Sequence, residues 1–406
     1  MRAAERLLNY IKVFTTSDEE STSTPSTARQ FDLANILVKE LQELGAEDAH
    51  VDEKCYVYAT IPATPGCEQA PVLGLIAHMD TAPDFSGEAV NPQIIENYDG
   101  EDVALGTSGR VLSVKQFPHL PALKGRTLIT TDGTTLLGAD DKAGIAEIMT
   151  VTEQLLSGTQ PHGKIRIGFT PDEEIGRGAD AFDVQKFGAD FAYTLDGGIE
   201  TEVVYENFNA AGAEFEINGV NIHPGDAKDK MVNASILAME INQMLPSCER
   251  PEHTELYEGF YHLCHMEGSV EHAKLSYIVR DHDSSSFAAR KKTLQHIAKT
   301  MNERYGAGTV TLTITDQYEN MAVMIKPCMH LIDHAKAVMR RLDLEPDVSP
   351  VRGGTDGARL SFMGLPCPNL GTGGYAFHGP YEHITAEGMD TAVQIVLGII
   401  ETYAEV

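Results

Sequence analysis

The sequence predicts a large α/β domain that is interrupted by a smaller α+β domain. Over residues 1–207, helical and strand-like segments alternate, as they do in α/β proteins. Over residues 208–320 the order becomes strand, helix, strand, strand, helix, strand, which is the split βαβ order of ferredoxin-like units. The alternating α/β pattern returns over residues 321–406. We therefore expect a discontinuous first domain at 1–207 and 321–406, with an inserted domain at 208–320.

The elements of the larger domain follow from hydrophobic periodicity. Apolar residues recur at a spacing close to 3.6 over Thr27–Leu44, which predicts a helix ending before Gly45. Val72–Ala77 is continuously apolar, as expected of a strand buried on both faces. Two more strands are predicted at Lys164–Thr170 and Phe191–Leu195, one helix after Asp141, and two late helices at His330–Arg341 and Ala386–Ala404.

The inserted domain is predicted in the same way. We expect strands at Ala213–Ile217, Phe260–Met266, Ala273–Val279 and Thr309–Thr315, and helices at Val232–Leu245 and Ser284–Arg304.

Composition restricts the possible partners. The chain has 60 acidic and 31 basic residues, a formal net charge of -29, which repels nucleic-acid phosphates and anionic lipid headgroups. The N-terminus shows no signal-peptide pattern, and no apolar run approaches the roughly 18 residues needed to span a bilayer. The 6 cysteines have no C-x-x-C spacing, so we expect reduced thiols. These features predict a soluble cytoplasmic protein with no nucleic-acid or membrane partner.

Polar residues that suit metal ions follow the predicted strands. His78 and Asp80 come directly after the first buried strand, and their side chains point the same way from an extended backbone. A zinc-bound histidine commonly donates its second ring N–H to a carboxylate, and Asp80 is placed to accept it. Taken alone, this pair is more often an ordinary surface pair.

A second acidic cluster opens a predicted helix. Asp140 and Asp141 follow Gly138, and either carboxylate could simply cap the helix and meet the positive end of its dipole. Capping explains one aspartate more easily than two. We expect Asp140 to face a metal ion and Asp141 to stabilise the helix start.

The third cluster places Glu173 and Glu174 side by side after a strand. Adjacent carboxylates point to different sides, so one can bind metal while its neighbour transfers protons. The alternative is a solvated acidic turn. Asp196 is a further acid at a strand end, and His378 lies in a glycine-rich stretch where a lone histidine means little by itself.

The order of these clusters is more informative than any one of them. Two histidines and several carboxylates at successive strand ends form a nitrogen and oxygen ligand set for zinc, with cobalt or manganese as substitutes. The sequence contains no phosphate-binding P-loop, dinucleotide fingerprint or nucleophilic-serine elbow that would favour another chemistry.

Over essentially its whole length, the chain resembles the co-catalytic dizinc aminopeptidase and carboxypeptidase family. The stretches that carry this resemblance are Asn91–Ile94, Leu136–Met149, Phe169–Glu174, Met231–Ala234, Gly259–Leu263 and Gly353–Asn369. The resemblance implies a mixed-sheet zinc-exopeptidase-like catalytic domain with an inserted α+β ferredoxin-like lid domain. It also implies removal of the N-terminal residue from tripeptides by a water activated by two zinc ions.

The family pattern assigns a role to each site residue. Asp140 bridges the two ions, and Glu173 is the general base. Asp80 orients His78. His78 and Asp196 complete one zinc site, and Glu174 and His378 complete the other. Members of the family also tend to hold the peptide bond between the two aspartates, here Asp140 and Asp141, in the cis form.

Three residues are expected to bind the substrate. His223 lies in a turn of the lid, where an ordinary surface turn is the alternative. Arg280 on the lid and Arg352 on the catalytic domain could hold the terminal carboxylate of a tripeptide, because a guanidinium binds a carboxylate through two hydrogen bonds. Both arginines could instead pair with the protein's own acids.

Other functions remain open at this point. The same site would suit a dipeptidase, a carboxypeptidase or an acyl-amino-acid deacylase. A non-catalytic metal-binding protein is a further alternative, although a pure binding site has no use for an unligated base beside a ligand. Some relatives form homodimers through the lid.

Overall fold

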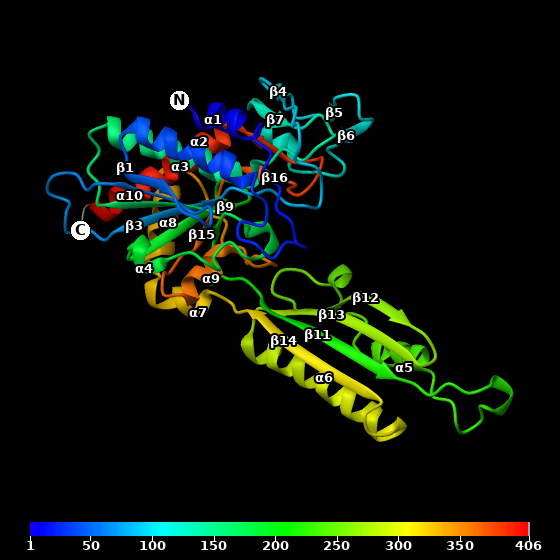
Figure 1. Ribbon diagram of the computed structural model, residues 1–406. Helices are drawn as coiled ribbons and strands as arrows, with labels where there is room; N and C mark the ends of the chain where they lie inside the picture. Colours follow the sequence, from blue (N-terminus) through cyan, green and yellow to red (C-terminus); the bar gives the residue numbers. More distant parts are fainter. Residues whose placement is uncertain (405–406) are drawn as a thin grey trace. The chain divides into compact units, whose positions relative to one another are not determined.

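The computed structural model describes residues 1–404, which form two compact units (Figure 1). Unit 1 comprises Met1–Tyr205, Val323–Ser349 and the described residues from Thr355 onward. Unit 2 comprises Glu206–Ala322 and the short segment Pro350–Gly354.

Unit 1 is organised around a mixed sheet with strand order β1-β2-β8-β3-β9-β15-β10. The three neighbouring pairs from β8 to β15 are parallel, and the pairs toward both edges are antiparallel. The strands are β1 (Glu47–Val51), β2 (Val57–Ile61), β3 (Leu73–His78), β8 (Ile165–Thr170), β9 (Phe191–Gly197), β10 (Val203–Val204) and β15 (Asn369–Gly371). Every residue of β3 is buried, as the continuous apolar run predicts.

Helices cover both faces of this sheet. In Figure 1, α1, α2 and α3 lie along one face, and α4 and α9 lie on the other. Aromatic residues of the second face form one cluster that includes Tyr58, Phe182 and Phe187. The helices of unit 1 are α1 (Ala3–Tyr10), α2 (Gln30–Leu44), α3 (Ala139–Ser157), α4 (Val184–Phe187), α8 (His330–Arg341), α9 (Asp356–Phe362) and α10 (Ala386–Ala404), and α7 (Ala322–Ile325) joins the units.

The boundaries of α2 show how accurately hydrophobic periodicity predicts where a helix begins and ends. The helix ends at Gly45, which adopts the left-handed conformation with φ 94°, as expected of a terminating glycine. It begins at Gln30 instead of Thr27, because backbone turns from Thr27 precede the regular helix. The side chain of Gln30 is buried and bonds to Asp172, as described below.

A smaller sheet in unit 1 supports the segment that contains His378. Its strand order is β16-β17-β7-β4, and all its pairs are antiparallel. The strands are β4 (Gln93–Ile95), β7 (Leu128–Thr130), β16 (Gly374–Tyr375) and β17 (His383–Thr385), and a separate hairpin pairs β5 (Val103–Leu105) with β6 (Arg110–Leu112). His378 therefore lies between two strands of one sheet.

Unit 2 has the predicted ferredoxin-like order. Its antiparallel sheet runs β12-β13-β11-β14, and α5 and α6 pack on it. The elements are β11 (Asn209–Asn218), α5 (Ala234–Gln243), β12 (Phe260–Gly268), β13 (His272–Asp281), α6 (Ser284–Tyr305) and β14 (Val310–Tyr318). The helix predicted from Val232 begins at Ala234, because the side chain of Asn233 accepts hydrogen bonds from two backbone N–H groups and caps it.

Two further findings concern the whole described chain. Within residues 1–404, no helix has both the length and the apolar character that a membrane span requires. All six cysteines carry free thiols. The mixed-sheet domain with a ferredoxin-like insertion confirms the predicted fold class.

Candidate metal centre

The parallel strands bring the predicted ligands to one edge of the sheet. His78 is the last residue of β3, Asp196 lies near the end of β9, and Glu173 follows β8 after a short turn. Because β3 is parallel to both neighbours, the three carboxyl ends meet at the same edge. Residues that are about 120 positions apart in the chain therefore share one site.

His78 lies at the centre of this cluster with only 2% of its surface exposed. Its Nε2 atom is 3.0 Å from Asp140 Oδ1 and 3.5 Å from Asp196 Oδ1. Its Nδ1 atom is 3.1 Å from the backbone carbonyl oxygen of Asp80 and 3.4 Å from the Asp80 carboxylate. Asp80 thus contacts the ring nitrogen that faces away from Asp140, which leaves Nε2 for a metal ion.

The Asp80 carboxylate also holds the turn that contains both glutamates. Its Oδ1 accepts the backbone N–H of Glu173 at 3.0 Å, and its Oδ2 accepts that of Glu174 at 3.2 Å. Asp80 is fully buried, so these bonds are shielded from water. One carboxylate therefore connects the histidine of β3 with the turn after β8.

Asp140 bonds to both histidines at the start of α3. Its Oδ1 faces His78, and its Oδ2 is 3.2 Å from Nε2 of His378. Burial by itself would raise the pKa of Asp140, but hydrogen bonds from the two histidines hold it below its ordinary value. The peptide bond to Asp141 is cis, as the resemblance implies.

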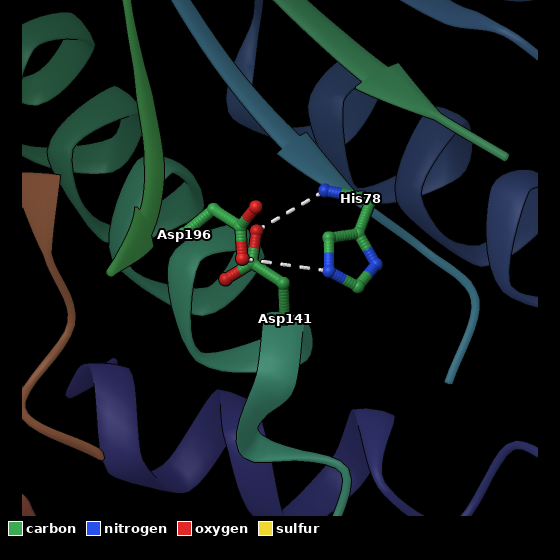
Figure 2. A group of neighbouring side chains, drawn as sticks. All are labelled: His78, Asp141 and Asp196. Atoms are coloured by element: carbon green, nitrogen blue, oxygen red, sulfur yellow. Dashed lines mark hydrogen bonds and ion pairs between the residues drawn. The ribbon is translucent and has the colours of Figure 1, made fainter. Parts of the chain in front are cut away.

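Asp141 is also part of the cluster, with a different function. Its carboxylate accepts the backbone N–H of His78 at 3.1 Å and that of Gly144 at 3.2 Å. Figure 2 shows Asp141 beside His78 and Asp196, and the three residues offer ligand atoms within 4.8 Å of one another. Because both oxygens already accept backbone N–H groups, we interpret Asp141 as support for β3 and the start of α3 and not as a ligand.

Glu174 and His378 form the other side of the cluster. Glu174 Oε2 is 3.0 Å from His378 Nε2, and its buried Oε1 has no hydrogen-bond partner. Burial raises the pKa of Glu174 to about 8. Hydrogen bonds to Asp140 and Glu174 raise the pKa of His378 to about 11. His378 is far more open than His78, with 45% of its side chain exposed.

Glu173 lies beside this cluster without bonding to it through its carboxylate. Burial raises its pKa well above the ordinary value, and Asp196 raises it further. Glu173 lines a small pocket together with Ile76, Ala77, His78, Thr170, Thr194, Asp196 and Asp356. It is therefore close to the ligands, and burial favours the protonated form of its carboxyl group.

The residues fit a pair of zinc ions. His78, Asp140 and Glu174 offer one imidazole nitrogen and two carboxylate oxygens within 4.8 Å of one another. Such nitrogen and oxygen donors are the usual zinc ligands. Burial raises the pKa of Asp196 to about 6, and crowded buried carboxylates of this kind are stabilised by a cation.

The three predicted substrate residues all belong to unit 2. His223 is exposed, and its Nδ1 accepts the backbone N–H of Gly225 at 3.1 Å. Arg280 donates to the backbone oxygens of Ala211 and Val279. The sequence analysis places Arg352 on the catalytic domain, whereas the structure groups it with unit 2.

Neither arginine pairs with the protein's own acids in residues 1–404. Arg352 donates to the backbone oxygens of Leu256 and Glu258 and to the Thr254 hydroxyl, and its guanidinium lies 5.1 Å from the ring of Phe208. All of these partners are uncharged, so the alternative of pairing with carboxylates is wrong for the described chain.

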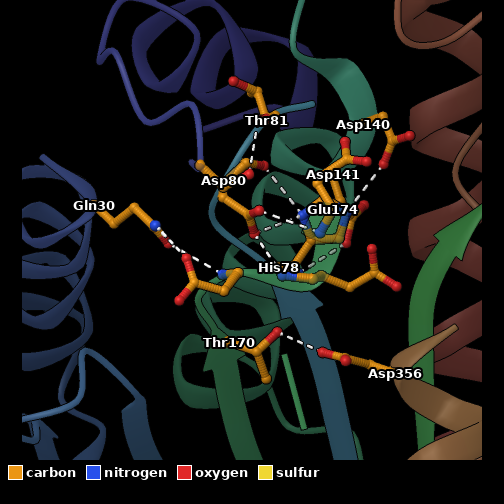
Figure 3. Close-up of polar contacts among 12 residues, drawn as sticks. Gln30, His78, Asp80, Thr81, Asp140, Asp141, Thr170, Glu174 and Asp356 are labelled. Carbon is orange, nitrogen blue, oxygen red and sulfur yellow. Dashed lines mark hydrogen bonds and ion pairs between the residues drawn. The ribbon is translucent and has the colours of Figure 1, made fainter. Parts of the chain in front are cut away.

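Sequence reasoning missed several residues that support the ligands. Asp172, which directly precedes Glu173, has a positive φ of 58°. Its carboxylate accepts hydrogen bonds from Ser26 and Gln30, and these bonds hold the residue in place. Figure 3 shows Gln30 on one side of the site and Asp356 on the other, where Asp356 accepts the Thr170 hydroxyl at 2.8 Å. Burial raises the pKa of Asp356 to about 7. Asp172 and Asp356 lie in stretches that carry the family resemblance, but no local pattern shows that they support the ligands, and only their position in the fold reveals this.

Comparisons with known proteins were made for sequence and for fold. Residues 205–309 match the family model described as a peptidase dimerisation domain. A curated peptidase T from Clostridium perfringens is 56% identical over 403 residues, which cover 99% of this chain and 98% of that protein.

Two solved structures share the fold. The aminopeptidase PepT from Bacillus cereus has a TM-score of 0.78 at 23% identity, and the match covers 99% of this chain and 98% of that one. A dinuclear metal-binding peptidase of the M20 family from Bacillus subtilis has a TM-score of 0.67 at 15% identity, with 99% and 98% covered.

Proposed function

The chain belongs to the peptidase T family, and from this membership we propose that it removes the N-terminal residue from tripeptides at a centre for two zinc ions. One structural observation carries the proposal. Imidazole and carboxylate atoms from four separate segments converge at the carboxyl ends of β3, β8 and β9. The enzyme is thus a zinc-dependent aminopeptidase, a hydrolase of short peptides.

Each zinc ion would have ligands of its own and one ligand in common. Asp140 would be the shared ligand, because its two oxygens face the two histidines. His78 and Asp196 would complete one site, and Glu174 and His378 would complete the other. When bound, the two ions lower the pKa of a water toward about 7 and polarise the peptide carbonyl.

Glu173 is the general base of this proposal. Its carboxyl group lies beside the ligands but is not itself assigned as a ligand of either zinc ion, and burial raises its pKa. It takes a proton from the attacking water and returns it to the leaving amine. Asp80 positions both Glu173 and His78, because its carboxylate holds the backbone of the first and contacts the ring of the second.

We also propose that residues 208–320 form an inserted lid domain and that residues 1–207 and 321–406 form the catalytic domain. His223, Arg280 and Arg352 would bind the substrate from the lid side, and the arginines would hold its terminal carboxylate. Support comes from the hydrogen-bond partners of both guanidinium groups within the described chain, which are backbone oxygens and one hydroxyl and include no carboxylate. Burial lowers the pKa of Arg280, as expected of a desolvated cation without an anionic partner.

Assembly and location are finer parts of the same proposal. The match of residues 205–309 to a peptidase dimerisation domain supports a homodimer. The free thiols of all six cysteines support a cytoplasmic location, where thiols stay reduced.

A peptide panel tests the proposed activity. Zinc-loaded protein is incubated with matched di-, tri- and tetrapeptides, and the products are identified by mass. We expect release of the N-terminal residue, with tripeptides cleaved fastest. Fastest cleavage of dipeptides, release of the C-terminal residue, or hydrolysis of acyl amino acids would replace this proposal with a dipeptidase, carboxypeptidase or deacylase.

The carboxylate contact is tested with the best tripeptide and its C-terminal amide. We expect the amide to have a much lower kcat/KM, and Arg280→Met or Arg352→Met to shrink that difference. Equal rates for acid and amide would remove the arginines from the proposal without affecting the zinc centre.

A further inference from the structure

Glu382 lies four residues after His378 and is almost fully buried, with 1% of its surface exposed. Its Oε2 accepts the backbone N–H groups of Leu137 at 2.7 Å and Gly138 at 2.9 Å. Its Oε1 accepts the backbone N–H of Asp140 at 3.0 Å. One carboxylate therefore holds three backbone groups of the segment that leads into α3.

These three hydrogen bonds fix the position of the backbone at Asp140. Gly138 takes the left-handed conformation with φ 79°, so the chain turns sharply just before the bridging aspartate. The N–H groups at a helix start have no partner within the helix, and they need an acceptor when they are buried. Glu382 supplies that acceptor on the backbone side, while the two histidines contact the Asp140 side chain.

The segment that contains Glu382 also contains one of the proposed zinc ligands, His378. His378 and Glu382 both lie between β16 and β17, so they belong to one connection of the small sheet. His378 bonds to the Asp140 carboxylate, and Glu382 bonds to the Asp140 backbone. This connection thus contacts the bridging residue at two points, and a displacement of one contact would move the other.

We propose that Glu382 is a positioning residue that holds the bridging Asp140 in register with the zinc ligands. The proposal rests on the zinc centre described above, and it adds a residue that binds neither zinc nor substrate. The nearby cation Lys142 interacts electrostatically with Glu382, which raises the pKa of Lys142 against the effect of its burial. Its ammonium group donates to the backbone oxygen of Val13 at 2.8 Å, and no ion pair joins it to Glu382 in the described chain. A simple link between two segments is the alternative, and it would affect stability without affecting zinc.

Glu382→Gln separates these possibilities. The amide keeps one oxygen, which can serve Leu137 and Gly138 together, but its NH2 group then faces the N–H of Asp140. We expect zinc affinity, measured by competition with a chelator, to fall about 10–100-fold, as for other residues that orient metal ligands. Thermal unfolding of the zinc-free protein gives the stability change separately.

Glu387→Gln is the matched control. Glu387 lies in the first turn of α10, accepts the backbone N–H of Thr127 at 2.7 Å and its hydroxyl at 3.1 Å, and contacts no ligand. The substitution removes the same charge and a similar bond. We expect it to lower the unfolding temperature of the zinc-free protein while leaving zinc affinity within about twofold of wild type.

Glu382→Asp keeps the test decisive if the glutamine variant does not fold. It retains both oxygens but withdraws them by one methylene group, so we expect a smaller loss of zinc affinity. Wild-type zinc affinity in a folded Glu382 variant would overturn the positioning role and leave the zinc centre intact. A wild-type protein that bound no zinc would overturn both.

Discussion

The two sides of the metal centre are built differently. The strand side comprises His78, Asp80 and Asp196, which lie at or just beyond the ends of β3 and β9. The turn side comprises Glu174, which lies in the short 3-10 helix Glu173–Ile175 after β8, and His378, which lies in the connection after β16. His78 is 2% exposed and His378 is 45% exposed, so the sides also differ in their access to water.

This difference shows what each kind of backbone contributes. Strand ends are placed by the ladder of the central sheet, so the strand side is fixed before any metal contact is made. The turn side depends on residues with positive φ, such as His378 at 62° and Asp172 at 58°. Such conformations need support from neighbouring groups. Around Asp172 this support is visible, because the Gln30 amide oxygen accepts the backbone N–H of Asp172 at 3.2 Å and the Asp80 carboxylate accepts the next two N–H groups.

The shared ligand gives the largest expected effect. Among residues 1–404, Asp140 is the one residue that hydrogen-bonds to both His78 and His378. We therefore expect Asp140→Ala to lower the zinc content from two ions per chain to none, with no measurable peptidase activity. Metal analysis and tripeptide hydrolysis check this. Asp32→Ala, at an exposed position on α2, is the control and should keep both ions.

Retention of one ion in Asp140→Ala would identify the side that binds metal without the bridge. We expect neither side to do so. Full occupancy by two ions would be incompatible with Asp140 as the bridging ligand.

Glu173→Gln tests the base that lies between the two sides. The amide preserves shape but cannot accept the proton, so we expect kcat to fall about 10²–10⁴-fold with two zinc ions still bound. Steady-state kinetics and metal analysis of the same sample check this. A kcat near wild type would remove Glu173 from the reaction, and loss of zinc would show that it acts as a ligand.

The histidines should differ in their contribution to the stability of the zinc-free fold. His78→Ala removes the buried imidazole that contacts both Asp140 and Asp196, and breaking a buried ion pair in this way costs about 3–5 kcal/mol. His378→Ala breaks contacts of a half-exposed side chain, which cost about 0–1 kcal/mol. Urea unfolding of chelator-treated proteins measures both. Equal losses would mean that the two sides are supported alike.

The strand side was largely predictable from the sequence. The apolar run before His78 predicts a buried strand, and parallel strands of one sheet gather the residues that follow them. The ferredoxin-like order of unit 2 follows from periodicity in the same way. On the turn side, the paired glutamates after β8 already indicated a metal ligand beside a proton-transfer group. His378 was assigned only through the resemblance, because a lone histidine among glycines carries no local signal.

The supporting residues could not be predicted because their partners are distant backbone groups. Glu382 accepts N–H groups more than 240 positions away, and Asp172 accepts that of Ser26, 146 positions away. Sequence periodicity records side-chain burial and not which backbone group a carboxylate meets. For the same reason the contact of Asp141 with His78 appears only in the structure.

The smallest expected effect comes from substituting the carboxylates beside the two histidines, Asp80 and Asp84, and comparing the losses of kcat/KM. Asp80 is buried, and its two oxygens accept the N–H groups of Glu173 and Glu174. Asp84 is 66% exposed, and its carboxylate lies 3.6 Å from Nδ1 of His378. Asp80→Asn places an NH2 group against one of these donors, so we expect kcat/KM to fall about 10–100-fold.

Asp84→Asn, the same chemical change at the exposed histidine, should lower kcat/KM by no more than about fivefold, because exposed ion pairs are worth about 0–1 kcal/mol. High salt should reduce even this difference, since exposed charges are screened while the bonds of Asp80 are not. A loss in Asp84→Asn as large as that in Asp80→Asn would show that carboxylate support of the histidine does not depend on burial. The comparison between the two sides would then rest on backbone conformation alone.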